Sequence, residues 1–176
     1  MALTVEDGTG RADAESYISV AEATTYHDNR GNAAWAALSS DTQREQMLRR
    51  ATDYMVAMYR ERWAGYRERP TQALDWPRYD VPMPDAAAMP DSMYGAYYPY
   101  TVVPEVVKRA CAELALRALD GDLLADLEPP VIEETVGPIT TRYAQGSRQT
   151  KAYPQIDAML APLLQGANGS IKVVRA

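Results

Sequence analysis

The stretch VPEVVKRACAELALRALDG, from Val103 to Gly121, decides the fold. Its apolar residues recur at the 3.6-residue period of a helix and form one continuous stripe: Val103, Val106, Val107, Ala110, Cys111, Leu114 and Ala118. Pro104 suits the first helical position, and a glycine such as Gly121 commonly ends a helix. The i,i+4 pairs Glu105–Arg109 and Glu113–Arg117 predict ion pairs on the solvent-facing side. We expect this helix to be the central element of a helical core.

Capping signals and apolar stripes predict the other helices. Ser19 and Glu22 have the capping-box pattern, which predicts a helix from about Val20 to Asn29. Ser40 and Gln43 offer a second capping box, and a Met-rich apolar stripe follows it. This second pattern predicts a helix over residues 41–63. The remaining helical pieces should be short and lie over residues 32–38 and 154–164.

The rest of the chain is predicted to be extended or irregular. Val131–Val136 and Ile139–Ala144 are rich in Val, Ile, Thr and Tyr and flank a Gly-Pro, which predicts two short strands or one bent strand. Four prolines between Tyr79 and Thr101 forbid a regular helix or a central strand, so a long Tyr/Pro-rich contact loop is expected there. Residues 1–18 should form an N-terminal arm and residues 165–176 a C-terminal tail. The sequence thus predicts one mainly α domain over residues 1–176, a small bundle of about four helices with a short β-hairpin or extended strands.

Charge and composition limit the classes of partner. The chain has 12 tyrosines and no phenylalanine, which favours half-exposed aromatic surfaces such as interfaces. Its net charge of −6 argues against a general nucleic-acid binder. The charge is uneven, however, because the stretch Arg44–Arg78 carries eight arginines against five carboxylates. We call these eight arginines the arginine band; a solvated helix face and a binding surface are both compatible with it.

No pattern of residues indicates catalysis, a metal or a nucleotide cofactor. His27 is the only histidine and Cys111 the only cysteine, so zinc sites that need several such ligands are excluded. His27 falls near the end of a predicted helix, where an imidazolium can interact with the helix dipole, and we interpret it as structural. The chain has neither a Walker glycine loop nor a GxGxxG motif. No run approaches the ~18 apolar residues of a membrane span. We therefore expect no enzymatic activity, no cofactor and no membrane.

Two segments are the candidate partner-binding sites. Exposed tyrosines of the contact loop suit protein contacts, whereas its aspartates and its lack of Lys or Arg disfavour phosphate. The C-terminal tail could add a strand to a neighbour's sheet edge, although a frayed terminus is the alternative. The candidate residues are Tyr94, Tyr97, Tyr98, Tyr100, Ile171, Val173 and Val174.

A series of short motifs lies in a fixed order along roughly residues 3–165. These motifs are Val5–Gly10, Ser16-Tyr17, Ala21–Ala23 with Tyr26, Trp35, Arg49–Tyr54, Gln72–Leu74 with Trp76–Arg78, Val103-Pro104 with Ala112–Ala115, and Val136–Ile139 with Tyr143. In this order they resemble a group of tailed-bacteriophage proteins labelled putative DnaT-like single-stranded-DNA-binding proteins. That group is in turn similar to the head–tail connector, or adaptor, proteins of phage virions.

The resemblance implies a virion structural protein. Connectors of this type assemble as homo-oligomeric rings, commonly of twelve copies, between the portal and the tail or neck proteins, and lengthen a channel through which DNA passes without specific binding. The chain would be made in the host cytoplasm and reside in the virion neck. The alternative is a DnaT-like single-stranded-DNA-binding accessory protein. It would use the arginine band for phosphate and Trp63, Tyr66 or Trp76 for base stacking.

Overall fold

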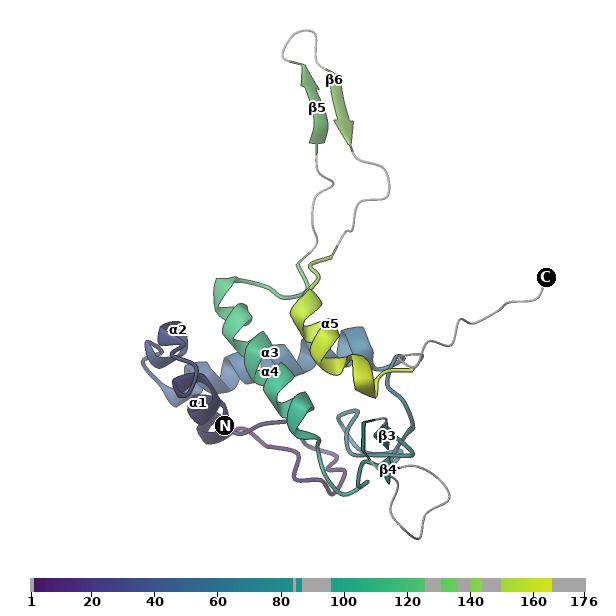
Figure 1. Cartoon of the computed structure of the whole chain (residues 1–176). Helices are drawn as coiled ribbons and strands as arrows, with labels where there is room; N and C mark the ends of the chain where they lie inside the picture. The colour runs from purple at the N-terminus through teal and green to yellow at the C-terminus, as the bar shows by residue number, and fades with distance from the viewer. Residues whose placement is uncertain are drawn as a thin grey trace, which may run out of the picture.

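A computed structural model of the chain describes residues 2–83, 85–86, 96–125, 131–135, 140–143 and 150–165. The described part is mainly helical, as the sequence predicts (Figure 1). The α-helices are α1 (Val20–Asp28), α2 (Ala33–Ala36), α3 (Asp41–Tyr59), α4 (Glu105–Arg117) and α5 (Pro154–Leu160). Short 3-10 turns extend two of them, over Ala118–Asp120 after α4 and Ala161–Leu163 after α5. Among these described helices, none is both long and apolar enough to cross a bilayer.

Three antiparallel pairs of short strands accompany the helices. Tyr66–Arg67 (β1) pairs with Arg78–Tyr79 (β2), and Pro82–Met83 (β3) pairs with Ala96–Tyr97 (β4). The third pair is a ribbon of β5 (Val131–Thr135) and β6 (Thr140–Tyr143), which Figure 1 shows apart from the helical body. This ribbon confirms the two short strands expected around Gly137-Pro138. The β3–β4 pair lies within the predicted contact loop and is two residues long, in keeping with its prolines.

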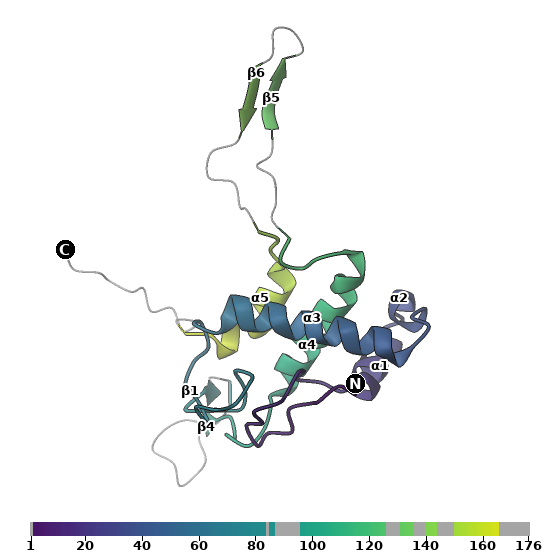
Figure 2. The ribbon, with the colours of Figure 1, turned by 180° about the vertical axis from the view of Figure 1, so that it is seen from behind.

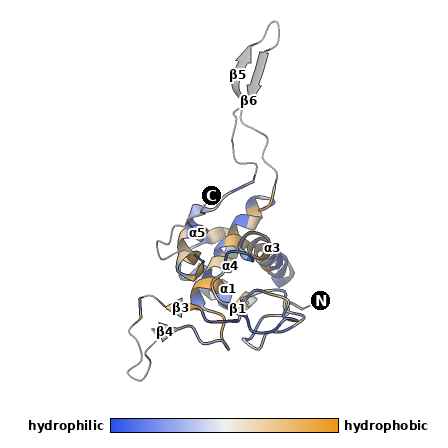
Figure 3. Cartoon of the chain, turned by 90° about the vertical axis from the view of Figure 1, so that its right-hand side faces the viewer, coloured by the Kyte–Doolittle hydropathy of each residue, from blue (hydrophilic) through white to orange (hydrophobic). Residues whose placement is uncertain are grey.

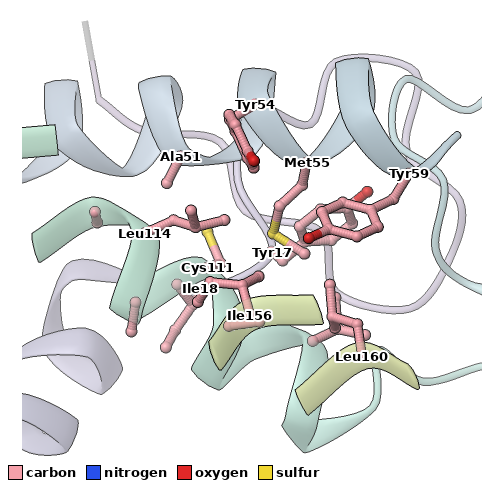
Figure 4. Packing of buried hydrophobic residues seen from close by; sticks show 14 of the residues in the cluster. Tyr17, Ile18, Ala51, Tyr54, Met55, Tyr59, Cys111, Leu114, Ile156 and Leu160 are labelled. Atoms are coloured by element: carbon pink, nitrogen blue, oxygen red, sulfur yellow. The ribbon is translucent and has the colours of Figure 1, made fainter. Parts of the chain in front are cut away.

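The core forms where α3 and α4 cross. Figure 2 shows α3 running across the helical body with α4 crossing behind it, and α5 packs against α4. Small residues on both helices, such as Ala51 and Ala110, let the backbones approach, while Met55, Leu114 and Leu160 fill the space between the helices (Figure 4). Cys111 is a free, buried thiol whose Sγ lies 3.5 Å from the Thr52 hydroxyl. Apolar and polar residues share each helix, as the amphipathic patterns predict (Figure 3).

The predicted helix starts are confirmed, but α3 ends four residues early. Ser19 and Glu22 form the expected capping box at α1, and Ser40 caps α3 by accepting from the backbone N–H of Gln43. The helix predicted to reach Trp63 stops at Tyr59, where a turn follows in which the N–H groups of Arg62 and Trp63 donate to the carbonyl oxygen of Tyr59. Trp63 also forms an antiparallel bridge with Leu164. At α4, Pro104 takes the N-cap position, one residue before the helix begins.

The N-terminal segment folds against the body rather than projecting as an arm. The carboxylate of Glu6 is buried and accepts three backbone N–H groups, those of Gly8, Gly10 and Arg11, at 2.9–3.0 Å. Tyr17 has no exposed surface, and its hydroxyl accepts the backbone N–H of Asp75 at 3.0 Å. The buried Tyr17 side chain therefore anchors the N-terminal segment in the core. Residues 166–176, the predicted tail, lie outside the described residues.

The predicted surface position of Glu113 is wrong. The sequence places Glu113 on the solvent-facing side of α4, but only 8% of this residue is exposed. Its carboxylate accepts from the Tyr26 hydroxyl at 3.0 Å and from Arg117 at 2.7 Å. Burial opposes its ionised form, yet these partners, chiefly Arg117, keep the pKa of Glu113 below its usual value. The ion pair with Arg117 therefore forms as predicted but on a nearly buried carboxylate, and the bond from Tyr26 to the same carboxylate links α1 to α4.

His27 is structural, as expected, but it does not act as an imidazolium. It is fully buried, and its Nε2 lies 3.1 Å from the carbonyl oxygen of Ala112. A carbonyl only accepts, so Nε2 carries the proton and Nδ1 accepts from the Asn32 amide at 2.9 Å. Burial lowers the pKa of His27, which favours the neutral ring.

Truncating Leu114 should reveal the contribution of the α3–α4 contact. Leu114 has no exposed surface, so Leu114→Ala removes buried apolar area and leaves a cavity. We expect the free energy of unfolding to fall by about 2–5 kcal/mol. Leu124→Ala, at a leucine that is 39% exposed, is the matched control and should change it by about 0.5 kcal/mol or less. Equal effects in urea denaturation would contradict this view of the core.

Stability should fall on mild acidification because of His27. An unfolded histidine titrates near pH ~6.5, and the folded pKa lies lower. Protons therefore bind the unfolded chain first, and the stability present above that pH is lost as the pH falls below it. Between pH 7.5 and 5.5 the loss should be at most about 1.4 kcal/mol per pH unit. His27→Gln should be less stable at pH 7.5 and lack this dependence; an unchanged pH profile in the variant would contradict the assignment.

Candidate functional site

Tyrosine side chains gather on the outside of the two small strand pairs β1–β2 and β3–β4. Six large apolar or aromatic side chains among the described residues are conspicuously exposed, and four of them are these tyrosines: Tyr66 (72%), Tyr79 (39%), Tyr97 (49%) and Tyr100 (47%). We call these four residues the tyrosine surface. An exposed aromatic cluster of this kind is typical of a binding site rather than of ordinary surface.

Strand pairing and ring stacking hold the tyrosine surface together. Tyr66 faces Tyr79 across β1–β2, which puts both side chains on the same face of that ribbon. Tyr79 stacks on Tyr100 with ring centroids 4.4 Å apart and an interplanar angle of 19°. Tyr66 and Tyr97 both line an open groove of about 710 Å³ that also contains Asp80 and Pro82. The four rings therefore form one surface built from three separate stretches of chain.

The predicted contact residues take different places. Tyr97 and Tyr100 belong to the tyrosine surface, whereas Tyr98 turns inward. Its ring packs edge-on against Trp76 at 6.3 Å, and burial raises the pKa of its hydroxyl. Tyr94, Ile171, Val173 and Val174 lie outside the described residues. Tyr66 and Tyr79 are absent from the predicted partner-binding set; Tyr66 precedes the contact loop, and Tyr79 is the first residue of that loop.

Most of the arginine band is committed to internal contacts. Five of its eight arginines pair with carboxylates: Arg44 with Asp41, Arg49 with Glu15 and Glu45, Arg60 with Asp75, Arg62 with Asp157, and Arg69 with Glu68. Arg50 donates to the carbonyl oxygens of Ala118 and Gly121 at the C-terminal end of α4. The band is thus mainly a structural element, and it does not form a continuous phosphate-binding stripe.

Two of the three aromatic residues predicted for base stacking are inaccessible. Trp63 and Trp76 have no exposed surface and pack edge-to-face with ring centroids 5.7 Å apart. Their indole N–H groups have no hydrogen-bond partner within the part of the chain that the structure describes. Only Tyr66 can meet a base from solution.

A small pocket opens beside Tyr66, and we call it the arginine pocket. Its volume is about 230 Å³, and its walls include Arg60, Glu61, Tyr66, Arg67, Asp75 and Arg78. Arg60 donates from Nε to Oδ1 of the buried Asp75 at 2.9 Å and from Nη2 to the carbonyl oxygen of Ala73 at 3.3 Å. Arg67 donates from Nη1 to the carbonyl oxygen of Gln72 at 3.3 Å. Three guanidinium groups here face two carboxylates, so the pocket is locally positive.

Arg78 holds the pocket in place. It is 6% exposed and donates to three carbonyl oxygens, those of Ala64 and Gly65 at 2.7 Å and that of Asp75 at 3.1 Å. Burial lowers the pKa of Arg78, and the nearby Asp75 opposes that shift. Gly65 has φ +66°, and a Cβ there would lie 1.9 Å from the carbonyl oxygen of Tyr79. Only glycine lets β1 and β2 approach this closely.

The sequence alone hardly predicts the arginine pocket. Asp75 and Arg78 lie in a Trp-Pro loop without regular periodicity, and Arg60 comes from the end of a helix 15 residues earlier. A charge count over the arginine band points to the right region but cannot separate buried, bonded arginines from available ones.

The whole chain, residues 1–176, matches a sequence family described as "Putative DnaT-like ssDNA binding protein". The chain belongs to this family. The family is described by what it binds rather than as a family of enzymes. No curated protein and no solved structure gives a significant match to the chain. The expected family label is therefore confirmed, whereas the connector role implied by the resemblance stays a prediction.

Replacing Arg78 by lysine should show that the guanidinium, and not merely its charge, holds the pocket. An ammonium cannot reproduce three divergent hydrogen bonds to Ala64, Gly65 and Asp75. We expect Arg78→Lys to lower the free energy of unfolding by about 2–4 kcal/mol. Arg67→Lys, at an exposed arginine of the same pocket, is the control and should stay within about 0.5 kcal/mol. Comparable stability of the two variants would contradict the anchoring role.

Proposed function

We propose that the protein binds single-stranded DNA through the tyrosine surface and the adjoining arginine pocket. The observation that carries this proposal is the juxtaposition of Tyr66, the most exposed aromatic ring among the described residues, with the guanidinium groups of Arg60 and Arg67. Proteins that bind single strands combine rings on which bases stack with cations that contact the backbone. The description of the family supports the same activity.

The charge distribution sets the character of this binding. The chain as a whole carries −6, and most of its arginines are paired. Long-range attraction for DNA is therefore weak, and stacking must supply most of the affinity. With Arg60 and Arg67 as the phosphate contacts, log K should fall with log salt with a slope of only about −1.4, at about −0.7 per phosphate on a single strand. A general nucleic-acid binder would show a far steeper slope.

Titration of a fluorescent single-stranded oligomer at two salt concentrations tests the proposal. Tyr66→Ala removes a stacking ring and should weaken binding by about 1–3 kcal/mol. Leu124→Ala, an exposed leucine outside the tyrosine surface, should bind like the wild type. Circular dichroism of each variant controls for folding. Failure of the wild type to bind at low salt, or equal affinities of the two variants, would overturn the proposal.

A second candidate is the head–tail connector, and one structural observation favours it. The tyrosine surface lies beside Asp80, while the net charge of the chain is acidic, which suits contact with protein at least as well as contact with phosphate. In this case the chain forms a ring, about twelve copies in the resembling connectors, between portal and tail in the virion neck. The tyrosine surface then contacts a neighbouring copy, the portal or a tail protein.

Particle assembly in the absence of this chain separates the second candidate from the first. A connector is required for joining, so particles lacking it should accumulate as filled capsids without tails, and the wild-type chain should restore joining. The double variant Tyr97→Ala/Tyr100→Ala, which leaves the core untouched, should fold but fail to restore it. Normal joining without the chain would exclude the connector role.

A further inference from the structure

One oxygen of Asp75 is left unsatisfied by the fold. The side chain of Asp75 has no exposed surface, and its Oδ1 accepts from Arg60 at 2.9 Å. Its Oδ2 is buried and has no hydrogen-bond partner among the residues that the structure describes. Leaving a buried carboxylate oxygen without a donor is costly, so such a group in a native fold calls for an explanation. A donor supplied from outside the chain would provide one.

The surroundings of this oxygen define what kind of donor fits. Asp75 forms part of the wall of the arginine pocket, about 230 Å³ in volume, with Arg60, Arg67 and Arg78 around it. Three guanidinium groups repel a metal ion or a lysine or arginine side chain of a partner. The donor must therefore be a neutral N–H or O–H group. The same cations favour a negative charge elsewhere on the ligand.

The arginines of the pocket differ in what they can still bind. Arg78 uses all of its donor nitrogens on carbonyl oxygens. Arg60 uses Nε and Nη2, and Arg67 uses Nη1. Within the described residues, Nη1 of Arg60 and both Nε and Nη2 of Arg67 remain available to an anion. Arg67 is exposed, so it is the better placed of the two to meet a phosphate from solution.

We propose that the arginine pocket takes one amino-bearing base of a single DNA strand. The exocyclic amino group donates to Oδ2 of Asp75, the base lies against Tyr66, and the adjoining phosphate contacts Arg67. This inference rests on the proposed single-stranded-DNA binding and adds a base preference to it. Asp75 is thus a specificity-determining residue, while Tyr66 and Arg67 bind any strand.

A comparison of cytosine with uracil tests the proposed base preference most directly. They are pyrimidines of the same size, but cytosine carries an amino donor at position 4 where uracil, like thymine, carries a carbonyl acceptor. The amino group satisfies Oδ2 of Asp75, whereas a carbonyl oxygen placed there repels it. Wild-type protein should therefore bind an oligomer of deoxycytidine about ten-fold more tightly than an oligomer of deoxyuridine of equal length. This comparison changes the ligand and leaves the protein intact.

Asp75→Asn provides the matched test on the protein side. If the amide oxygen keeps the bond from Arg60, its NH₂ group takes the place of Oδ2 and becomes a donor. The preference should then disappear or reverse toward deoxyuridine. Asp28→Asn, at the exposed end of α1, makes the same charge change away from the pocket and should keep the wild-type preference. Arg67→Ala should weaken both oligomers equally.

Fluorescence anisotropy measures the binding of the two oligomers and the competition by free deoxycytidine monophosphate. A cytidine preference that Asp75→Asn removes supports the inference, and competition by the mononucleotide shows that one base suffices. Equal binding of the two oligomers by the wild type overturns the base preference but not the binding function. Binding of neither oligomer overturns both. If Asp75→Asn does not fold, the wild-type comparison of cytidine with uridine still decides.

Discussion

Close packing of α3 on α4 is the constraint from which the rest of the fold follows. Ala51 on α3 and Ala110, Cys111 and Ala115 on α4 have no exposed surface and are small enough for the two backbones to approach (Figure 4). The other elements fill the space that this crossing leaves. The N-terminal segment inserts Tyr17 into the core, and α5 packs against α4. The strand pairs that carry the tyrosine surface follow the end of α3. Their position therefore depends on how α3 crosses α4.

Local patterns in the sequence were sufficient for the helices because their causes are local. The capping box of α1, the Ser40 cap of α3 and the apolar stripes of the helices depend on residues three or four apart. Two features needed information from distant residues. Glu113 is buried because the Tyr26 hydroxyl, 87 positions away, reaches it. The N-terminal segment folds inward because the Tyr17 hydroxyl accepts the backbone N–H of Asp75, 58 positions away, a contact that no periodicity indicates.

The candidate site was less predictable than the fold for a physical reason. Charge counts and aromatic counts do not record burial. The arginine band has the composition of a phosphate-binding region, but its guanidinium groups mostly satisfy carboxylates and carbonyl oxygens of the same chain. Trp63 and Trp76 have the chemistry of stacking residues but lie in the core. What remains accessible is Tyr66 with two neighbouring arginines, and only the three-dimensional arrangement selects them.

The single thiol of the chain makes the protein well suited to site-specific spectroscopy. Cys111 is completely enclosed between α3 and α4, and burial raises the pKa of its thiol, so little reactive thiolate forms. Maleimide reagents should consequently not react with Cys111 in the folded protein. A cysteine introduced at any outward position, such as the place of Asp28 or Leu124, would then carry a fluorophore or spin label alone. Distances between copies, or to a bound strand, become measurable without first removing a natural cysteine.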